Sequence, residues 1–362
     1  MLLKIDFRSG DAFRGPGSSL LGAHPFAPAG SRDTGCSRRS RPVTPINFKS
    51  YHFFIKTLST APLIFCLCPS LFYVIILNKI HLSATNANGA KNMIQYKNGQ
   101  ITVFESQLYK TTSTVIQTED CIIVVDPCIL PFEVDEIREY VMRIRGSRRI
   151  YLILTHSDWD HIVGAGAFPE ATVIASANFQ KKNPEEMIEQ VKAFDDEYYI
   201  DRKTPLIYPN VDMIVEKDGQ PLKIGNTVLT FYEAKGHTDD GIFAIVEPLG
   251  IWIAGDYLSD IEFPFIYSGS KDYVETLEKT ETILANHQIN ILIPGHGHAA
   301  FSKEEILKRK NESLLYIISL KKAIRSKKEH AHLIAQYPYQ RSLIKCHEEN
   351  VQFLMKEMEG ES

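Results

Sequence analysis

One seven-residue stretch of this 362-residue chain restricts its possible folds more than any other. After an apolar run at residues 150–154, the sequence reads Thr155-His156-Ser157-Asp158-Trp159-Asp160-His161. A loop at the end of a buried strand can turn two imidazoles and two carboxylates toward one place. So many ionisable groups would destabilise a fold unless a cation neutralised the carboxylates. The stretch therefore predicts a metal site at a strand end.

Three further candidate ligands stand where other apolar runs end: His237, Asp256 and His296. Each has a glycine beside it, which lets the backbone turn sharply and bring a short side chain close to a shared centre. Taken alone, each Gly-His or Gly-Asp pair is more typical of a turn than of a ligand. Together with the seven-residue stretch they predict a common site, because α/β folds gather functional groups at strand ends.

Short apolar runs alternate with helical patterns from Met93 onward, as expected of an α/β domain. The first helical pattern stops at Gly146, a residue suited to a helix C-terminus. Residues 179–217 are polar, aromatic and irregular, and we interpret them as an insertion of the kind that often covers a site, rather than another sheet layer. The expected strands are residues 101–104, 113–116, 121–125, 150–154, 228–231, 243–246, 251–254 and 289–293, and the expected helices are residues 134–144, 274–285 and 304–324.

The order of the candidate ligands resembles the ligand series of the metallo-β-lactamase superfamily, over roughly residues 94–300. In that family a His-x-His-x-Asp-His motif serves both metals of a dinuclear site, and a later His, an Asp bridge and a last His complete it. The resemblance implies an α/β fold, a four-layer αβ/βα sandwich, with two divalent metal ions. By position, the implied ligands are His156, Asp158 and His237 for the first ion, Asp160, His161 and His296 for the second, and Asp256 as the bridge.

The chain departs from the family pattern at one position, because Asp158 stands where a second histidine is usual. A carboxylate is a harder ligand than an imidazole, so it shifts the preference toward iron or manganese and lowers the Lewis acidity of the first ion. Zinc is still the expected metal, and iron and manganese are the alternatives.

The predicted chemistry is hydrolysis of a small ester, thioester, lactone or β-lactam. Two adjacent metal ions can lower the pKa of a shared water to about neutrality and polarise the bond under attack. We expect Asp160 to be catalytic as well as a ligand, by orienting that water or carrying its proton. A phosphodiesterase of the same fold is the main alternative, followed by a di-iron redox protein and a non-catalytic metal-binding protein. A His and Asp shell without cysteine favours catalysis over a structural zinc site.

Residues near the ligands have expected supporting roles. His298 would point the same way as His296 in an extended stretch, and could orient a ligand or donate to a substrate. Trp159 is expected to pack beneath the metal loop. Four aromatic residues after the bridging aspartate fit either the core, the commoner outcome, or a pocket lining: Tyr257, Phe263, Phe265 and Tyr267.

The first 92 residues differ in composition from the rest of the chain. They hold 11 Lys and Arg against 3 Asp and Glu, which leaves 29 against 41 for the remainder and charges of +8 and −12. We interpret residues 1–92 as a disordered or non-native extension, and Met93 as the start of the working protein. The uncharged apolar stretch at residues 57–78 could just span a bilayer, so export or membrane anchoring is the alternative to a cytoplasmic protein.

The predicted organisation is an extension at residues 1–92, a hydrolase domain at residues 93–300 and a helical C-terminal extension, packed on it, at residues 301–362. The acidic main body disfavours nucleic acid, so a small-molecule substrate is the expected partner. Membrane contact is expected only if residues 57–78 are retained. The six scattered cysteines predict no redox or zinc pair, and the oligomeric state stays open.

Overall fold

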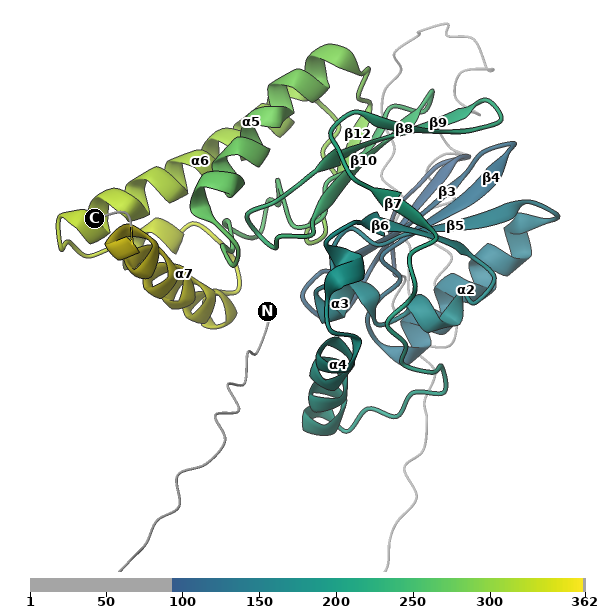
Figure 1. Cartoon of the computed structure of the whole chain (residues 1–362), viewed down its shortest axis with the longest axis horizontal. Helices are drawn as coiled ribbons and strands as arrows, with labels where there is room; N and C mark the ends of the chain where they lie inside the picture. Colours follow the sequence, from purple (N-terminus) through teal and green to yellow (C-terminus); the bar gives the residue numbers. More distant parts are fainter. Residues whose placement is uncertain (1–92, 361–362) are drawn as a thin grey trace, which may run out of the picture. The chain divides into compact units, whose positions relative to one another are not determined.

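The structure is a computed structural model that describes residues 93–360. Two β-sheets face each other, and helices cover the outer face of each: α2 lies over the first sheet, and α5 and α6 lie over the second (Figure 1). This arrangement confirms the four-layer αβ/βα sandwich. The predictions for residues 1–92, including the apolar stretch at 57–78, lie outside the described residues. Among residues 93–360, no helix combines the length and apolar character needed to cross a membrane.

The first sheet contains seven strands in sequence order. Its first four strands pair antiparallel, and the next three are added in parallel. Every residue of the central β4 is buried, as expected of a strand covered on both faces. The strands are β1 (Ile94–Lys97), β2 (Ile101–Glu105), β3 (Thr112–Gln117), β4 (Cys121–Val125), β5 (Arg149–Ile153), β6 (Thr172–Ser176) and β7 (Met213–Val215).

The second sheet contains five strands in the order β12-β11-β10-β9-β8. β8 to β11 form an antiparallel meander, and β12 joins β11 in parallel after the crossover through α5. The strands are β8 (Gln220–Ile224), β9 (Thr227–Glu233), β10 (Ile242–Glu247), β11 (Ile251–Ile253) and β12 (Ile291–Ile293).

Alternating side chains divide the core into layers. On β4, Ile123 and Val125 face the core between the two sheets, where they join Phe231 of β9. The alternate residues Ile122 and Val124 face α2 instead. Because successive side chains of a strand point to opposite faces, one apolar strand supplies two cores.

The helices begin and end close to the predicted boundaries where a prediction was made. α2 ends at Arg145, and its C-cap is Gly146, whose φ of 56° suits a residue without a Cβ. Two C-terminal helices contribute Tyr316 and Leu343 to the same core as Trp252 of β11, so the C-terminal helices pack on the second sheet. The longer helices are α2 (Pro131–Arg145), α4 (Pro184–Tyr198), α5 (Ser270–Asn286), α6 (Lys303–Arg325) and α7 (Gln340–Gly360), and α3 (Trp159–Ile162) is a single turn.

The predicted insertion at residues 179–217 adds no layer, but it is more regular than its sequence suggested. It contains α4, whose N-cap Asn183 accepts a hydrogen bond from Glu185 N, and the edge strand β7. The ring of Phe194, on α4, packs against the ring of Trp159 at a tilt, with centroids 4.3 Å apart. The insertion therefore packs directly against the loop that carries the candidate ligands.

Candidate metal centre

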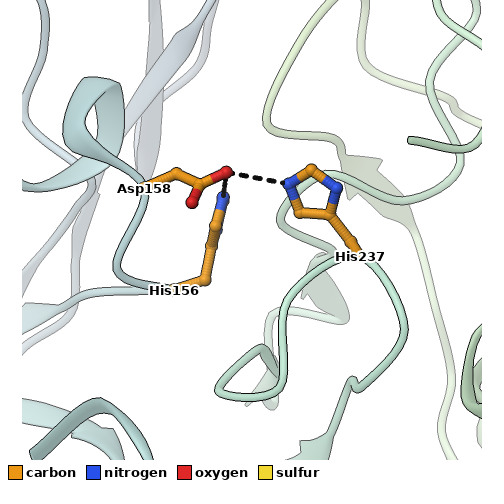
Figure 2. Close-up of side chains that lie close together, drawn as sticks. All are labelled: His156, Asp158 and His237. Atoms are coloured by element: carbon orange, nitrogen blue, oxygen red, sulfur yellow. Dashed lines mark ion pairs between the residues drawn. The ribbon is translucent and has the colours of Figure 1, made fainter. Parts of the chain in front are cut away.

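All seven predicted ligands come together at one end of the two sheets. The Thr155–His161 stretch follows β5 and runs into α3, while the other three ligands follow strands of the second sheet. Figure 2 shows His156 and Asp158 approaching from the first half of the fold and His237 from the second, with their polar atoms turned toward one another. The site is thus assembled across the two halves of the sandwich.

The first predicted ligand set forms a compact group. His237 Nε2 lies 3.3 Å from Asp158 Oδ2, and His156 Nε2 lies 3.7 Å from the same oxygen (Figure 2). Asp256 Oδ2 approaches both histidines, at 3.2 Å from His237 and 3.6 Å from His156. The predicted bridge therefore contacts both imidazoles of the first set.

The second set lies on the other side of Asp256. His161 Nε2 and His296 Nε2 face each other at 3.3 Å, and Asp160 Oδ2 lies 3.7 Å and 3.4 Å from them. Asp256 approaches His161 at 3.1 Å and His296 at 3.4 Å. Within each set of three, one ligand atom per residue lies within 4.8 Å of the others. Asp256 thus stands between two sets that match the predicted division of ligands.

Asp126, a residue that the sequence analysis did not select, orients the two histidines of the metal loop. Its Oδ2 accepts hydrogen bonds from Thr155 Oγ1 at 2.6 Å and His161 Nδ1 at 3.0 Å. Because the Thr155 hydroxyl proton goes to Asp126, Thr155 Oγ1 accepts from His156 Nδ1, at 3.0 Å. Both imidazoles therefore keep a proton on Nδ1, so Nε2 is the atom that faces the centre and would bind an ion once it is deprotonated.

The other two histidines are oriented by backbone carbonyl oxygens. His237 Nδ1 donates to Phe265 O, and His296 Nδ1 donates to Tyr109 O, each at 2.9 Å. A carbonyl oxygen only accepts, so these contacts fix the same tautomer. Metal-binding histidines in proteins are typically held in this way, with the second ring nitrogen bonded to an oxygen.

The chemistry of the buried donor atoms fits divalent cations. His156 Nε2, His237 Nε2, Asp158 Oδ2 and Asp256 Oδ1 are buried without a hydrogen-bond partner within residues 93–360. Leaving such groups unpaired is costly, and imidazole with carboxylate ligands suits zinc, iron or manganese. The cluster would therefore hold two ions through the seven side chains named above.

The pKa values of two histidines in the cluster also indicate that the site attracts positive charge. Burial opposes protonation of His237, but the neighbouring Asp158 and Asp256 carboxylates raise its pKa to about 10. Burial likewise opposes protonation of His296, yet Glu262 and Asp256 raise its pKa to about 9. Without metal, protons therefore supply the positive charge that the carboxylates require.

Two glycines allow the close approach that the sequence analysis inferred. A Cβ on Gly295 would collide with the Asp256 carboxylate and press on His161. A Cβ on Gly236 would collide with the backbone of Tyr273, and this glycine has a φ of 122°. A side chain at position 295 would push the Asp256 and His296 loops apart, and one at position 236 would push the His237 loop away from α5.

The prediction that His298 orients a ligand is wrong. His298 does not follow His296 into the site, because Gly297, with a φ of 93°, breaks the extended run. The His298 side chain is 59% exposed and its Nδ1 lies 2.9 Å from Asp260 Oδ2. Trp159 packs in the core, as expected.

Of the four aromatic residues after Asp256, Tyr257, Phe263 and Phe265 lie in the core, and the partly buried Tyr267 packs against it. Tyr257 also supports the site, since its hydroxyl accepts from His237 N at 2.9 Å. The Tyr267 ring lies beside the His237 ring, with centroids 5.3 Å apart. Phe265 supports the site through its backbone carbonyl oxygen, which accepts from His237 Nδ1.

The sequence profile of the metallo-β-lactamase superfamily matches residues 107–300. The chain therefore belongs to this superfamily and has the fold of its metal-dependent hydrolases. No curated protein matches it in sequence.

Solved structures share this fold at low sequence identity. A metallo-β-lactamase family protein from Thermus thermophilus is 17% identical, with a TM-score of 0.50 over 72% of this chain and 94% of its own. The stereoselective inverting sec-alkylsulfatase Pisa1 from Pseudomonas sp. is 13% identical, with a TM-score of 0.50 over 67% of this chain. The chain spans only 45% of the length of that sulfatase.

Proposed function

We propose that the chain is a hydrolase that uses two divalent ions, zinc in the first instance, to cleave a small ester, thioester, lactone or β-lactam. The observation that carries the proposal is the convergence of six candidate ligands in two sets of three, one on either side of Asp256, at a largely buried site. Two ions held there would acidify water and polarise the bond to be cleaved.

Asp256 and Asp160 have distinct roles in this proposed chemistry. Asp256 contacts histidines of both sets, so it would hold the two ions at a fixed separation. Asp160 Oδ2 accepts a 3.4 Å hydrogen bond from Thr111 Oγ1, which fixes its carboxylate beside His296. We assign to Asp160 the transfer of a proton during hydrolysis, in addition to metal binding.

The charges beside the metal loop support a neutral or weakly charged substrate. Lys182, on the insertion that packs against this loop, is paired with Asp239. Arg202, on the same insertion, is paired with Asp195 at 2.8 Å. Neither cation is therefore free to add to the charge that the metal ions would offer a phosphodiester, which favours hydrolysis of an acyl substrate over phosphodiester hydrolysis.

The test is metal-dependent turnover by the full-length protein. Protein stripped by a chelator and reloaded with Zn²⁺, Fe²⁺ or Mn²⁺ would be offered an aryl ester, an acyl thioester, a lactone, a chromogenic β-lactam and bis(p-nitrophenyl) phosphate. We expect metal-dependent hydrolysis of at least one acyl substrate and its loss in Asp256→Ala. The matched control is Asp218→Ala, because the Asp218 carboxylate pairs with Lys279 on the outer helix α5.

Each result of this panel distinguishes the candidate functions. Turnover confined to the phosphodiester would establish the phosphodiesterase instead. Full metal loading without turnover of any substrate would favour a non-catalytic metal-binding protein, and redox cycling of a bound iron pair would favour the di-iron alternative.

A further inference from the structure

Asn350, on the C-terminal helix α7, is buried in the core with no exposed surface. Its side chain bonds to the backbone on both sides of Phe265. Asn350 Oδ1 accepts from Ile266 N at 2.8 Å, and Asn350 Nδ2 donates to Pro264 O at 2.6 Å. A single amide therefore fixes the peptide groups immediately before and after this residue.

The segment held by Asn350 is the one that holds His237. Phe265 O accepts the 2.9 Å hydrogen bond from His237 Nδ1. Two residues later, Tyr267 N donates to His237 O at 3.0 Å. The segment thus contacts this ligand through both its ring and its backbone, while His237 Nε2 faces Asp158 and Asp256.

The orientation of Asn350 is itself fixed by the two C-terminal helices. Asn350 Nδ2 also donates to Tyr316 Oη of α6 at 3.0 Å. Because Tyr316 Oη accepts this bond, its own proton is free for His347 Nδ1 of α7, 2.8 Å away. Toward the end of α7, Glu357 accepts a hydrogen bond from Ser270 N at 2.9 Å. α7 therefore holds the loop after Asp256 through Asn350 and the first residue of α5 through Glu357.

We propose that Asn350 is a positioning residue for the first metal ion, acting through Phe265 and His237. The C-terminal helices, which lie beyond the part of the chain matched by the family profile, are then a component of the metal centre. This inference rests on the proposed metal site, but not on the identity of the substrate. Losing an outer partner of a metal ligand lowers affinity roughly 10- to 100-fold, and for a contact one step further out we expect about 10-fold.

The experiment compares Zn²⁺ affinities in the full-length protein by competition with a chromophoric chelator. We expect Asn350→Ala to weaken one of two bound ions about 10-fold and to leave the other unchanged. Leu343→Ala is the matched control, because Leu343 is buried in the same core on α7 but has no polar side-chain atom. Tyr316→Phe keeps the Asn350 amide and removes only the hydroxyl that accepts from Asn350 Nδ2, so its loss should be smaller. This second variant tests the proposal if Asn350→Ala does not fold.

A double-mutant cycle separates positioning from a general effect on stability. In a His237→Ala background, Asn350→Ala should change Zn²⁺ binding no more than Leu343→Ala does. The proposal would be overturned if Asn350→Ala and Leu343→Ala lost equal Zn²⁺ affinity, or if both ions were weakened equally. It would also be overturned if Asn350→Ala lowered Zn²⁺ affinity as much in the His237→Ala background as in the wild type. Since ion binding is the readout, failure to turn over any substrate would refute the proposed function and leave this test intact.

Discussion

Replacing Asp126 by asparagine tests whether this carboxylate fixes the His161 tautomer that can bind metal. In the wild-type protein Asp126 Oδ1 accepts from Thr155 N at 2.9 Å, and Oδ2 accepts from His161 Nδ1 at 3.0 Å. An amide has a single oxygen, so when Thr155 N retains it, an N–H group faces His161 Nδ1 and donates to it. The His161 proton then moves to Nε2, the atom that must face the ion.

We expect Asp126→Asn to weaken the second ion 10- to 100-fold, or about 1.4–2.7 kcal/mol, the range found when an outer partner of a metal ligand is lost. The assay is chelator competition for Zn²⁺. Asp120→Asn is the matched control, because Asp120 also accepts backbone hydrogen bonds, from Asn226 and Thr227, in a turn between strands. Unchanged affinity in Asp126→Asn, or an equal loss in Asp120→Asn, would refute the tautomer argument.

Three further outcomes are expected. Asp158→His supplies the nitrogen ligand usual in the family and should raise the preference for Zn²⁺ over Mn²⁺ in competitive loading; an unchanged ratio would count against the role of the carboxylate. Without metal, burial lowers the pKa values of His237 and His296, but the nearby carboxylates have the larger effect and raise them to about 10 and about 9. Both must lose protons to bind metal, so Zn²⁺ affinity should rise from pH 7 toward pH 9, with proton release seen by calorimetry; a flat profile would contradict this. Arg309→Met removes the donor to two backbone carbonyls and should lower the free energy of unfolding by about 1–3 kcal/mol, which an unshifted urea midpoint would disprove.

The sequence predicted the apolar strands and amphipathic helices well, because their periodicity directly reflects which faces are buried. β8 was missed since it lies at a sheet edge, with Pro221 and Lys223 exposed and no buried residue. α4 was missed because only Val191 and Phe194 are buried along its 15 residues, which leaves a weak apolar stripe. Both elements bury little, so their sequences carry little of the pattern. β6 was missed as well, although it lies inside the first sheet and four of its five residues are buried.

The convergence of the seven candidate ligands was predictable because metal-binding chemistry restricts them to few residue types and topology brings strand ends together. Asp126 offered the same signal, an acidic residue directly after a buried strand, but it lacked a neighbouring glycine or histidine. The carbonyl groups of Phe265 and Tyr109 carry no side-chain signature at all. Asn350 lies 113 positions beyond His237 in the chain, and only the folded structure connects them.

The number of metal ions bound per full-length chain tests the central claim most directly. Elemental analysis after loading with Zn²⁺, Fe²⁺ or Mn²⁺ would be made on the wild-type protein, Asp256→Ala and Asp218→Ala. The shared site predicts about two ions in the wild type and in Asp218→Ala, and clearly fewer in Asp256→Ala, which lacks the carboxylate between the two sets. Absence of bound metal from the wild-type protein after loading with each ion would contradict the account.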